Sequence, residues 1–151
     1  MSWLAIAWSE SAPVGDVYER AIITLMAHRA NADGTGAFPS TPTLAKYAMC
    51  DERSIRRRLE VLRDRGLIAY GDQDLALKIP ARYRPKVYDL LIPFTWYSAA
   101  QLVDVNRERG NQGLPPLSEA ERPPIPEVSR ARKSRRDAGI SRPCVRQTAG
   151  V

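Results

Sequence analysis

A chain of 151 residues has room for one domain of ordinary size with extensions, and 44% hydrophobic residues can build a modest core. Two cysteines far apart and a single histidine offer no cluster with metal-ligand spacing, which argues against a structural zinc site. The net charge of +6 is concentrated in residues 129–151, which hold seven basic residues and one acidic residue and suit a polyanionic partner.

Residues 1–14 form an apolar arm that carries Trp3 and Trp8. The arm lacks the positively charged start of a secretion signal and is far shorter than a membrane span. We therefore expect a soluble, cytoplasmic protein with no membrane partner. The arm is expected to pack on the neighbouring domain; a contact between two copies of the chain is the alternative, because tryptophan is enriched at interfaces.

A first long helix is predicted from Asp16 to about Ala30. Asp16 followed by Glu19 resembles a capping box with an acidic cap. The helix should end near His28, which we interpret as a surface or capping residue. Its apolar positions fit one broad face: Val17, Ala21, Ile22, Leu25 and Met26. Residues 31–36, NADGTG, have the composition of a flexible connector.

Two short helices joined by a tight turn follow this connector. The first is predicted from Thr41 to about Ala48, with the Thr41 hydroxyl as its N-cap. The second begins after Asp51, whose carboxylate can accept hydrogen bonds from the free amides of the first turn. It ends at Gly66, because glycine readily adopts the left-handed conformation that closes a helix.

The second of these helices has one apolar side and one basic side. Ile55, Leu59 and Leu62 recur at helical spacing and should pack against the first helix. At about 100° per residue, Arg53 and Arg57 lie roughly opposite that stripe. Arginine therefore dominates the exposed N-terminal half of the helix.

Beyond Gly66 the pattern becomes that of strands. Residues 67–70 and 86–92 are predicted to pair in a small sheet, and residues 75–79 either extend the first strand or form a third. Pro80 and Pro85 bracket the tip of the connection, which carries two arginines and a tyrosine.

A final helix is predicted from Thr95 to just before Gly110, with Trp96, Ala99, Ala100 and Val103 at helical spacing. It should either cover the core or build a dimer. Prolines are frequent after Gly110 and apolar content falls, so residues 111–151 are expected to be mostly disordered.

At the two short helices the sequence resembles the winged helix-turn-helix domains of bacterial and phage DNA-binding proteins. The matching residues are Phe38-Pro39-Ser40, Leu44-Ala45, Ser54-Ile55, Leu59, Leu62 and Gly66-Leu67-Ile68. The resemblance implies an α+β fold, with a three-helix core plus a small β-wing at residues 15–93. To this are added the arm at 1–14, an appended helix at 94–110 and a Pro-rich basic tail at 111–151. Met49 stands where the family usually has glycine in the inter-helix turn.

The resemblance implies double-stranded DNA as the partner, with the helix at residues 52–65 in the major groove. A helix in that groove contacts bases mainly through its N-terminal half, and arginine can bind guanine with two parallel bonds. The candidates for reading bases are Arg53, Ser54, Arg56 and Arg57. The candidates for the DNA backbone are Thr41, Thr43, Lys46, Arg58, Arg82, Arg84, Lys86, Arg130, Arg132, Lys133, Arg135 and Arg136.

These observations favour a transcriptional regulator of a bacterial or phage system that binds DNA sequence-specifically, as a homodimer. A replication initiator of a phage or plasmid shares the fold and is one alternative. A winged-helix module that docks other proteins is the other, and the tail could also hold a protein partner. An enzyme is not expected, because the sequence contains no activated nucleophile, metal cluster or cofactor fingerprint. No cofactor is expected either.

Overall fold

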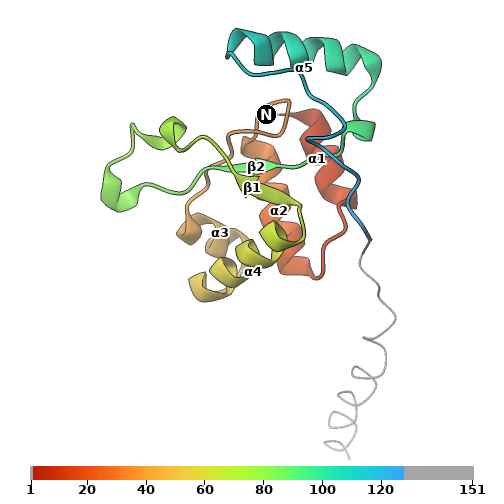
Figure 1. Ribbon diagram of the computed structural model, residues 1–151. Helices are drawn as coiled ribbons and strands as arrows, with labels where there is room; N and C mark the ends of the chain where they lie inside the picture. Colours follow the sequence, from red (N-terminus) through yellow and green to blue (C-terminus); the bar gives the residue numbers. More distant parts are fainter. Residues whose placement is uncertain (1, 128–151) are drawn as a thin grey trace, which may run out of the picture.

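The computed structural model describes residues 2–127, which form five α-helices and a two-stranded antiparallel sheet (Figure 1). The helices are α1 (Trp3–Ser11), α2 (Val17–Arg29), α3 (Thr41–Ala48), α4 (Glu52–Asp64) and α5 (Ala99–Asn111). The strands are β1 (Ile68–Tyr70) and β2 (Tyr88–Leu90). The predicted α+β helix-turn-helix fold is confirmed. Among the described residues, no helix is both long and apolar enough to cross a membrane.

Helix α2 lies at the centre of the fold and packs against α1, α3 and α4. Its start is capped as predicted: Asp16 accepts a hydrogen bond from the Glu19 amide at 2.8 Å, and the Glu19 carboxylate accepts one from the Gly15 amide. The predicted buried face was wrong in part. Val17 is 77% exposed, whereas Ile23 and Ala27 are buried. Helices on several sides bury a wider face than one apolar stripe predicts.

The apolar arm is helix α1, and it packs on α2. Ser2 caps its first turn, and Ala5 and Trp8 are buried in the core. The expected packing of the arm is therefore seen. Trp3 points away from the core and is 82% exposed, so the contact between copies of the chain stays a prediction.

Helices α3 and α4 form the predicted pair. Ser40, not Thr41, is the N-cap of α3, since the Thr43 amide donates to the Ser40 hydroxyl at 3.2 Å. The turn between the helices contains Met49 in the left-handed conformation, with φ of 56°. The predicted stripe of Ile55, Leu59 and Leu62 is buried.

Helix α4 ends in two hydrogen bonds that reach back over its last turn. The Leu67 amide donates to the Leu62 carbonyl and the Gly66 amide to the Arg63 carbonyl, each at 3.0 Å. This is the Schellman arrangement, which requires a left-handed residue at Gly66, where φ is 76°. It turns the chain directly into β1, which aligns the sheet beside α4.

Strands β1 and β2 pair with Ile68 opposite Leu90 and Tyr70 opposite Tyr88, and Ala37 bridges to Tyr88. Both predicted strands are present but are shorter than expected. The connection extends from the body as a long arm (Figure 1), with 3-10 turns at Gln73–Ala76 and Ala81–Tyr83. The strand expected at residues 75–79 is absent, because the Asp72 side chain caps the first of these turns.

Helix α5 starts later than predicted, after a 3-10 turn at Phe94–Trp96, and continues through Gly110. Its start is set by a capping box between Ser98 and Gln101. The predicted apolar face is wrong: Ala99, Ala100 and Val103 are exposed, and Trp96 is 39% exposed. Val105 and Arg109 are buried instead.

Residues 112–127 return from α5 across the body and are called the strap below. Leu117 and Arg122 of the strap are buried, and the Phe94 amide donates to the Arg122 carbonyl at 3.0 Å. The expectation of disorder was therefore wrong for this part of the tail. The remainder, with the basic run at residues 130–136, lies outside the described residues.

Candidate nucleic-acid interface

The exposed side of α4 presents arginines that differ in their partners. Arg56 donates to the Glu52 carboxylate at 3.1 Å, one turn earlier, and both side chains are largely exposed. Arg53 and Arg57 are exposed, and their side chains make no hydrogen bond or ion pair within residues 2–127. Their guanidinium groups are available to a ligand outside the protein.

Ser54 lies at the start of α4 and belongs to its cap. Its hydroxyl donates to Asp51 at 2.6 Å, and its amide donates to the same carboxylate at 3.2 Å. The hydrogen bond from the Ser54 side chain holds the pKa of Asp51 below its usual value, because it stabilises the charged form. The hydroxyl proton of Ser54 is thus used within the helix cap.

Arg58 is turned away from the other arginines and towards α2. Its guanidinium forms an ion pair with Asp16 at 3.2 Å and lies 4.6 Å from the centre of the Tyr18 ring. The same side of α4 carries Arg65, which contacts Glu19 and donates to the Pro13 carbonyl. These arginines join α4 to α2 and its N-terminal cap, and the Arg58 guanidinium is occupied within the fold.

The candidates on α3 lie beside α4. Lys46 is exposed, and the Thr43 and Ser40 hydroxyls lie 2.7 Å apart. Thr41 lines a groove between α3, α4 and the sheet. Thr41 and Arg56 line the same groove, so α3 brings a hydroxyl beside an arginine of α4.

The arm between β1 and β2 carries the candidates Arg82, Arg84 and Lys86, all exposed. Arg84 donates to the carbonyls of Ile79 and Leu77 at 3.1 and 3.3 Å, which holds the tip of the arm closed. Arg82 lies 5.0 Å from the ring centre of Tyr83. Lys86 lies at the base of the arm, beside β2.

The groove that contains Thr41 has a volume of about 220 Å³, and we call it the basic groove. Three cations line it, Arg56, Arg63 and Lys86, together with Glu60. Arg63 donates to the Tyr70 hydroxyl at 3.0 Å, and its guanidinium lies 3.9 Å from the ring centre. Sequence reasoning missed Arg63 and Tyr70. The helical spacing of Arg56, Glu60 and Arg63 was a visible signal, but their approach to Lys86 depends on strand pairing.

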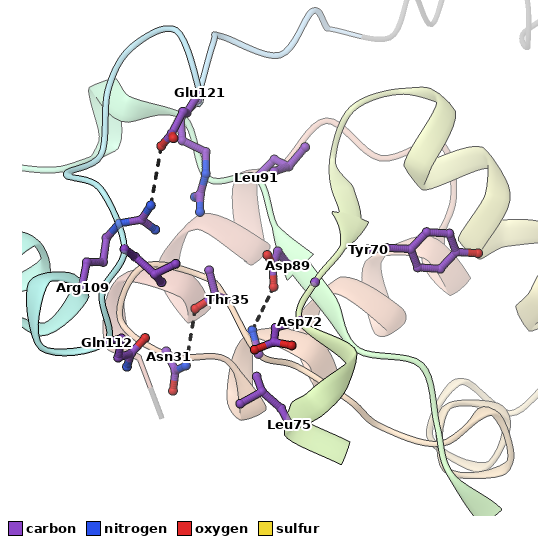
Figure 2. Close-up of a pocket in the computed structure, with 14 residues that line it drawn as sticks. Asn31, Thr35, Tyr70, Asp72, Leu75, Asp89, Leu91, Arg109, Gln112 and Glu121 are labelled. Carbon is purple, nitrogen blue, oxygen red and sulfur yellow. Dashed lines mark hydrogen bonds and ion pairs between the residues drawn. The ribbon is translucent and has the colours of Figure 1, made fainter. Parts of the chain in front are cut away.

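A second, larger cavity of about 540 Å³ lies between residues 31–36, the base of the sheet and the strap (Figure 2). Asp89 points into it, and its Oδ1 accepts a hydrogen bond from the Gly36 amide at 3.0 Å. Burial raises the pKa of Asp89 above its usual value. Burial likewise raises the pKa of its neighbour Tyr88 to about 12, so that phenol stays neutral at physiological pH.

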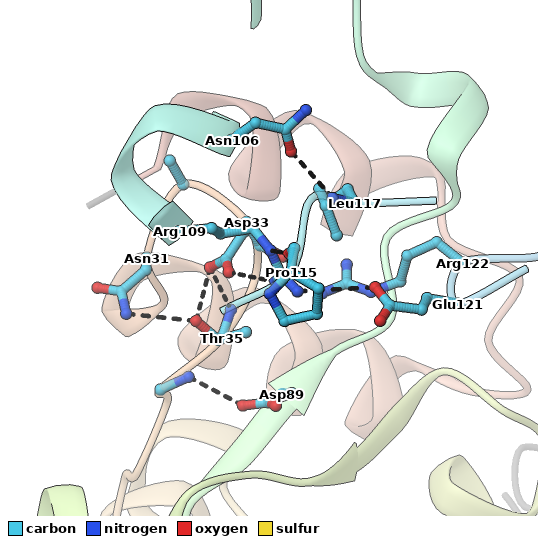
Figure 3. Close-up of polar contacts among 12 residues, drawn as sticks. Asn31, Asp33, Thr35, Asp89, Asn106, Arg109, Pro115, Leu117, Glu121 and Arg122 are labelled. Atoms are coloured by element: carbon cyan, nitrogen blue, oxygen red, sulfur yellow. Dashed lines mark hydrogen bonds and ion pairs between the residues drawn. The ribbon is translucent and has the colours of Figure 1, made fainter. Parts of the chain in front are cut away.

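The arginines beside this cavity are used to hold the fold together (Figure 3). Arg109 forms a buried ion pair with Asp33 at 2.8 Å and donates to the Pro115 carbonyl, also at 2.8 Å. Arg122 donates to the Asp33 and Ile92 carbonyls at 2.8 and 3.3 Å. The connector at residues 31–36 is therefore fixed to the strap and is not the free loop that its composition predicts. Within residues 2–127, no three His, Cys, Asp or Glu side chains come together as metal ligands would.

Comparison with known families matches residues 17–68 to the model of a helix-turn-helix domain. The match covers α2, α3 and α4 and ends at the first residue of β1. It includes the base-reading candidates of α4, and it excludes the arm between the strands, α5 and the strap. No curated protein and no solved structure shows a significant match to the chain.

Proposed function

We propose, on the premise that residues 17–68 are a helix-turn-helix domain, that this protein binds double-stranded DNA sequence-specifically through α4. The observation that carries the proposal is a pair of exposed arginines on the N-terminal half of that helix, Arg53 and Arg57, whose side chains have no partner within residues 2–127. The opposite side of α4 is anchored in the core. On a rigid helix in the major groove, each arginine guanidinium can donate two parallel hydrogen bonds to the edge of a guanine.

Other exposed groups would contact phosphates and orient the duplex. Lys46 lies beside α4, and Arg82 lies on the arm between β1 and β2, which would act as a wing along the DNA. Phosphate contacts of this kind position a protein without reading sequence. We assign the protein no catalytic activity.

Within this proposal we favour a transcriptional regulator of a bacterial or phage system that acts as a homodimer. One short helix reads too few bases for strong discrimination in a genome, and two copies would double the site. A replication initiator would use the same surface. A module that docks other proteins would not depend on the arginines of α4.

The test is selection of bound duplexes from a random DNA pool at near-physiological salt, with the intact protein and Arg53→Ala/Arg57→Ala in parallel. Each arginine that binds a guanine with two bonds contributes about 1–3 kcal/mol of discrimination. The intact protein should enrich a motif that the double variant does not. Arg107→Ala, an exposed arginine of α5, is the control and should enrich the same motif.

The symmetry of the enriched motif reports whether two copies bind together, since a dimer requires two related half-sites. Absence of any enrichment by the intact protein would contradict sequence reading. A motif that survives in the double variant would show that bases are read by other residues.

A further inference from the structure

We propose that the basic groove is a seat for one backbone phosphate of the DNA duplex, held by Arg56, Arg63 and Lys86. The proposal rests on the proposed function and adds two residues to it: Arg63 as a direct contact and Tyr70 as the residue that positions it. The groove lies where α3, α4 and β1 converge. A phosphate bound there would therefore link the helix-turn-helix domain to the connection between β1 and β2.

Tyr70 lines the groove, is half-exposed, and contacts two of the groove's cations through its ring. Arg63 lies 3.9 Å from the ring centre, and the Lys86 ammonium lies 4.8 Å from it. Cations are attracted to the face of an aromatic ring, so Tyr70 draws two positive groups from different elements to one place. The positive charges that line the groove repel one another, and an anion bound there would relieve that repulsion.

The cations of the groove retain donors for a ligand. Arg63 donates to the Tyr70 hydroxyl, and within residues 2–127 neither Arg63 nor Lys86 forms an ion pair with a carboxylate. Among the same residues Arg56 pairs only with Glu52, in an exposed contact that is weak in water. A phosphate oxygen can accept several charge-assisted hydrogen bonds at once, as this arrangement offers.

Size and charge both suit a phosphate. At ~30 Å³ per water molecule, 220 Å³ is space for about seven waters, and a phosphate group fits in it. The lining holds three positive groups against one carboxylate, Glu60. Thr41 adds a hydroxyl from the first turn of α3. Glu60 is therefore the residue that opposes an anion, and its removal should strengthen binding.

The groove-lining side chains of α4 lie on the flank next to Arg53 and Arg57, because at about 100° per residue Arg56 and Arg63 stand roughly 60–80° from Arg53. From Arg56 to Glu60 to Arg63 the helix advances by four and three residues, which keeps these side chains on the side that faces the sheet. A duplex whose bases contact Arg53 and Arg57 would thus place the sugar-phosphate backbone of one strand along the groove.

The experiment measures the affinity of the full chain for a duplex of about 25 base pairs between 50 and 200 mM salt, with Arg63→Gln/Lys86→Gln as the variant. Each neutralised phosphate contributes about −0.9 to the slope of log affinity against log salt. The slope should fall by roughly one in the variant, and the preferred motif should be unchanged. Glu60→Gln should bind more tightly than the intact protein.

The matched control is Arg29→Gln/Arg107→Gln, which removes the same charge from exposed positions of α2 and α5 outside the groove. An equal loss of slope in this control would contradict the proposed phosphate site, because the loss of net charge alone would then explain the effect. A slope and affinity unchanged by Arg63→Gln/Lys86→Gln would overturn it as well.

A second measurement locates the phosphate. A set of duplexes carries one uncharged methylphosphonate each, moved along the backbone. The intact protein should lose affinity at one position in each half-site, and Arg63→Gln/Lys86→Gln should be insensitive at that position alone. Equal sensitivity of the two proteins at every position would overturn the seat while leaving DNA binding intact. Failure of the intact protein to bind any duplex would overturn the proposed function and the seat together.

Discussion

Arginines that look alike in the run RSIRRR of α4 are used in different ways. Arg58 joins α4 to α2 through Asp16, whereas Arg53 and Arg57 have no partner within residues 2–127. The reason is the 100° turn per residue, which points neighbouring side chains to different sides of the helix. Arg56 is intermediate, since its exposed pair with Glu52 is worth only about 0.3–0.5 kcal/mol and can be exchanged for a DNA contact.

Met49 is strained, because it occupies the left-handed region with φ of 56° while its side chain is 88% exposed. That conformation costs a residue with a Cβ roughly 1–2 kcal/mol. Glycine removes this cost but adds about 0.5–1 kcal/mol of chain entropy to the unfolded state. Met49→Gly should therefore raise the free energy of unfolding by about 0.5–1 kcal/mol in urea denaturation.

The matched control for Met49→Gly is Met49→Val, which keeps the strain and adds branching at Cβ. It should destabilise the protein. A loss of stability in Met49→Gly would mean that the methionine side chain contributes a contact that outweighs the strain of its backbone.

At the scale of elements, α5 and the strap are held by a buried ion pair in addition to the apolar contacts of Val105 and Leu117. Arg109 and Asp33 form an ion pair whose side chains are less than a tenth exposed. Removing one partner of such a pair leaves a buried charge without compensation. The connector, α5 and the strap therefore depend on one another, although they are distant in sequence.

Arg109→Met should lower the free energy of unfolding by about 3–5 kcal/mol, because Asp33 would remain buried and charged. Adding Asp33→Asn should recover part of this loss, since the amide oxygen can still accept from Thr35. Urea denaturation of both variants checks the prediction.

Arg107→Met serves as the control for Arg109→Met and should change stability by less than about 1 kcal/mol, because its pair with Asp104 is exposed. Equal stability of Arg109→Met and the intact protein would show that the strap is not held by this ion pair.

On the scale of the whole molecule, the folded body includes the strap and is followed in the sequence by a strongly basic segment. Residues 129–151 carry seven basic residues and one acidic residue. We propose that they add phosphate contacts to those of the folded domain, because clustered lysine and arginine bind DNA without reading its sequence.

The variant that tests this is a chain that ends at residue 127, which lacks the basic segment. It should bind every duplex more weakly and with a flatter salt dependence, which can be measured as affinity against salt concentration. A chain that ends at residue 111 should also be less stable, because it loses the buried Leu117 and Arg122. If the chain that ends at residue 127 changed only its preferred motif, the phosphate role of residues 129–151 would be wrong.

Local signals predicted the helix-turn-helix well. The bounds of α3, the acidic cap of α4, its buried stripe and its end at Gly66 all follow from residues within a few positions of one another. The same signals predicted two strands after α4 but not their length. Composition failed for residues 31–36 and 112–127, because the buried side chains of Arg109 and Arg122 hold them through an ion pair and hydrogen bonds to carbonyls, which apolar content does not register.

The sequence by itself determined the helix-turn-helix domain and the basic character of the exposed side of α4, since helix caps and apolar periodicity act over a few residues. Only the tertiary structure decided that Arg58 joins α4 to α2 through Asp16, and that Arg63 and Lys86 both lie against the Tyr70 ring. Those contacts form between residues far apart in the chain. They depend on the crossing of helices and the register of two strands, which no short stretch of sequence specifies.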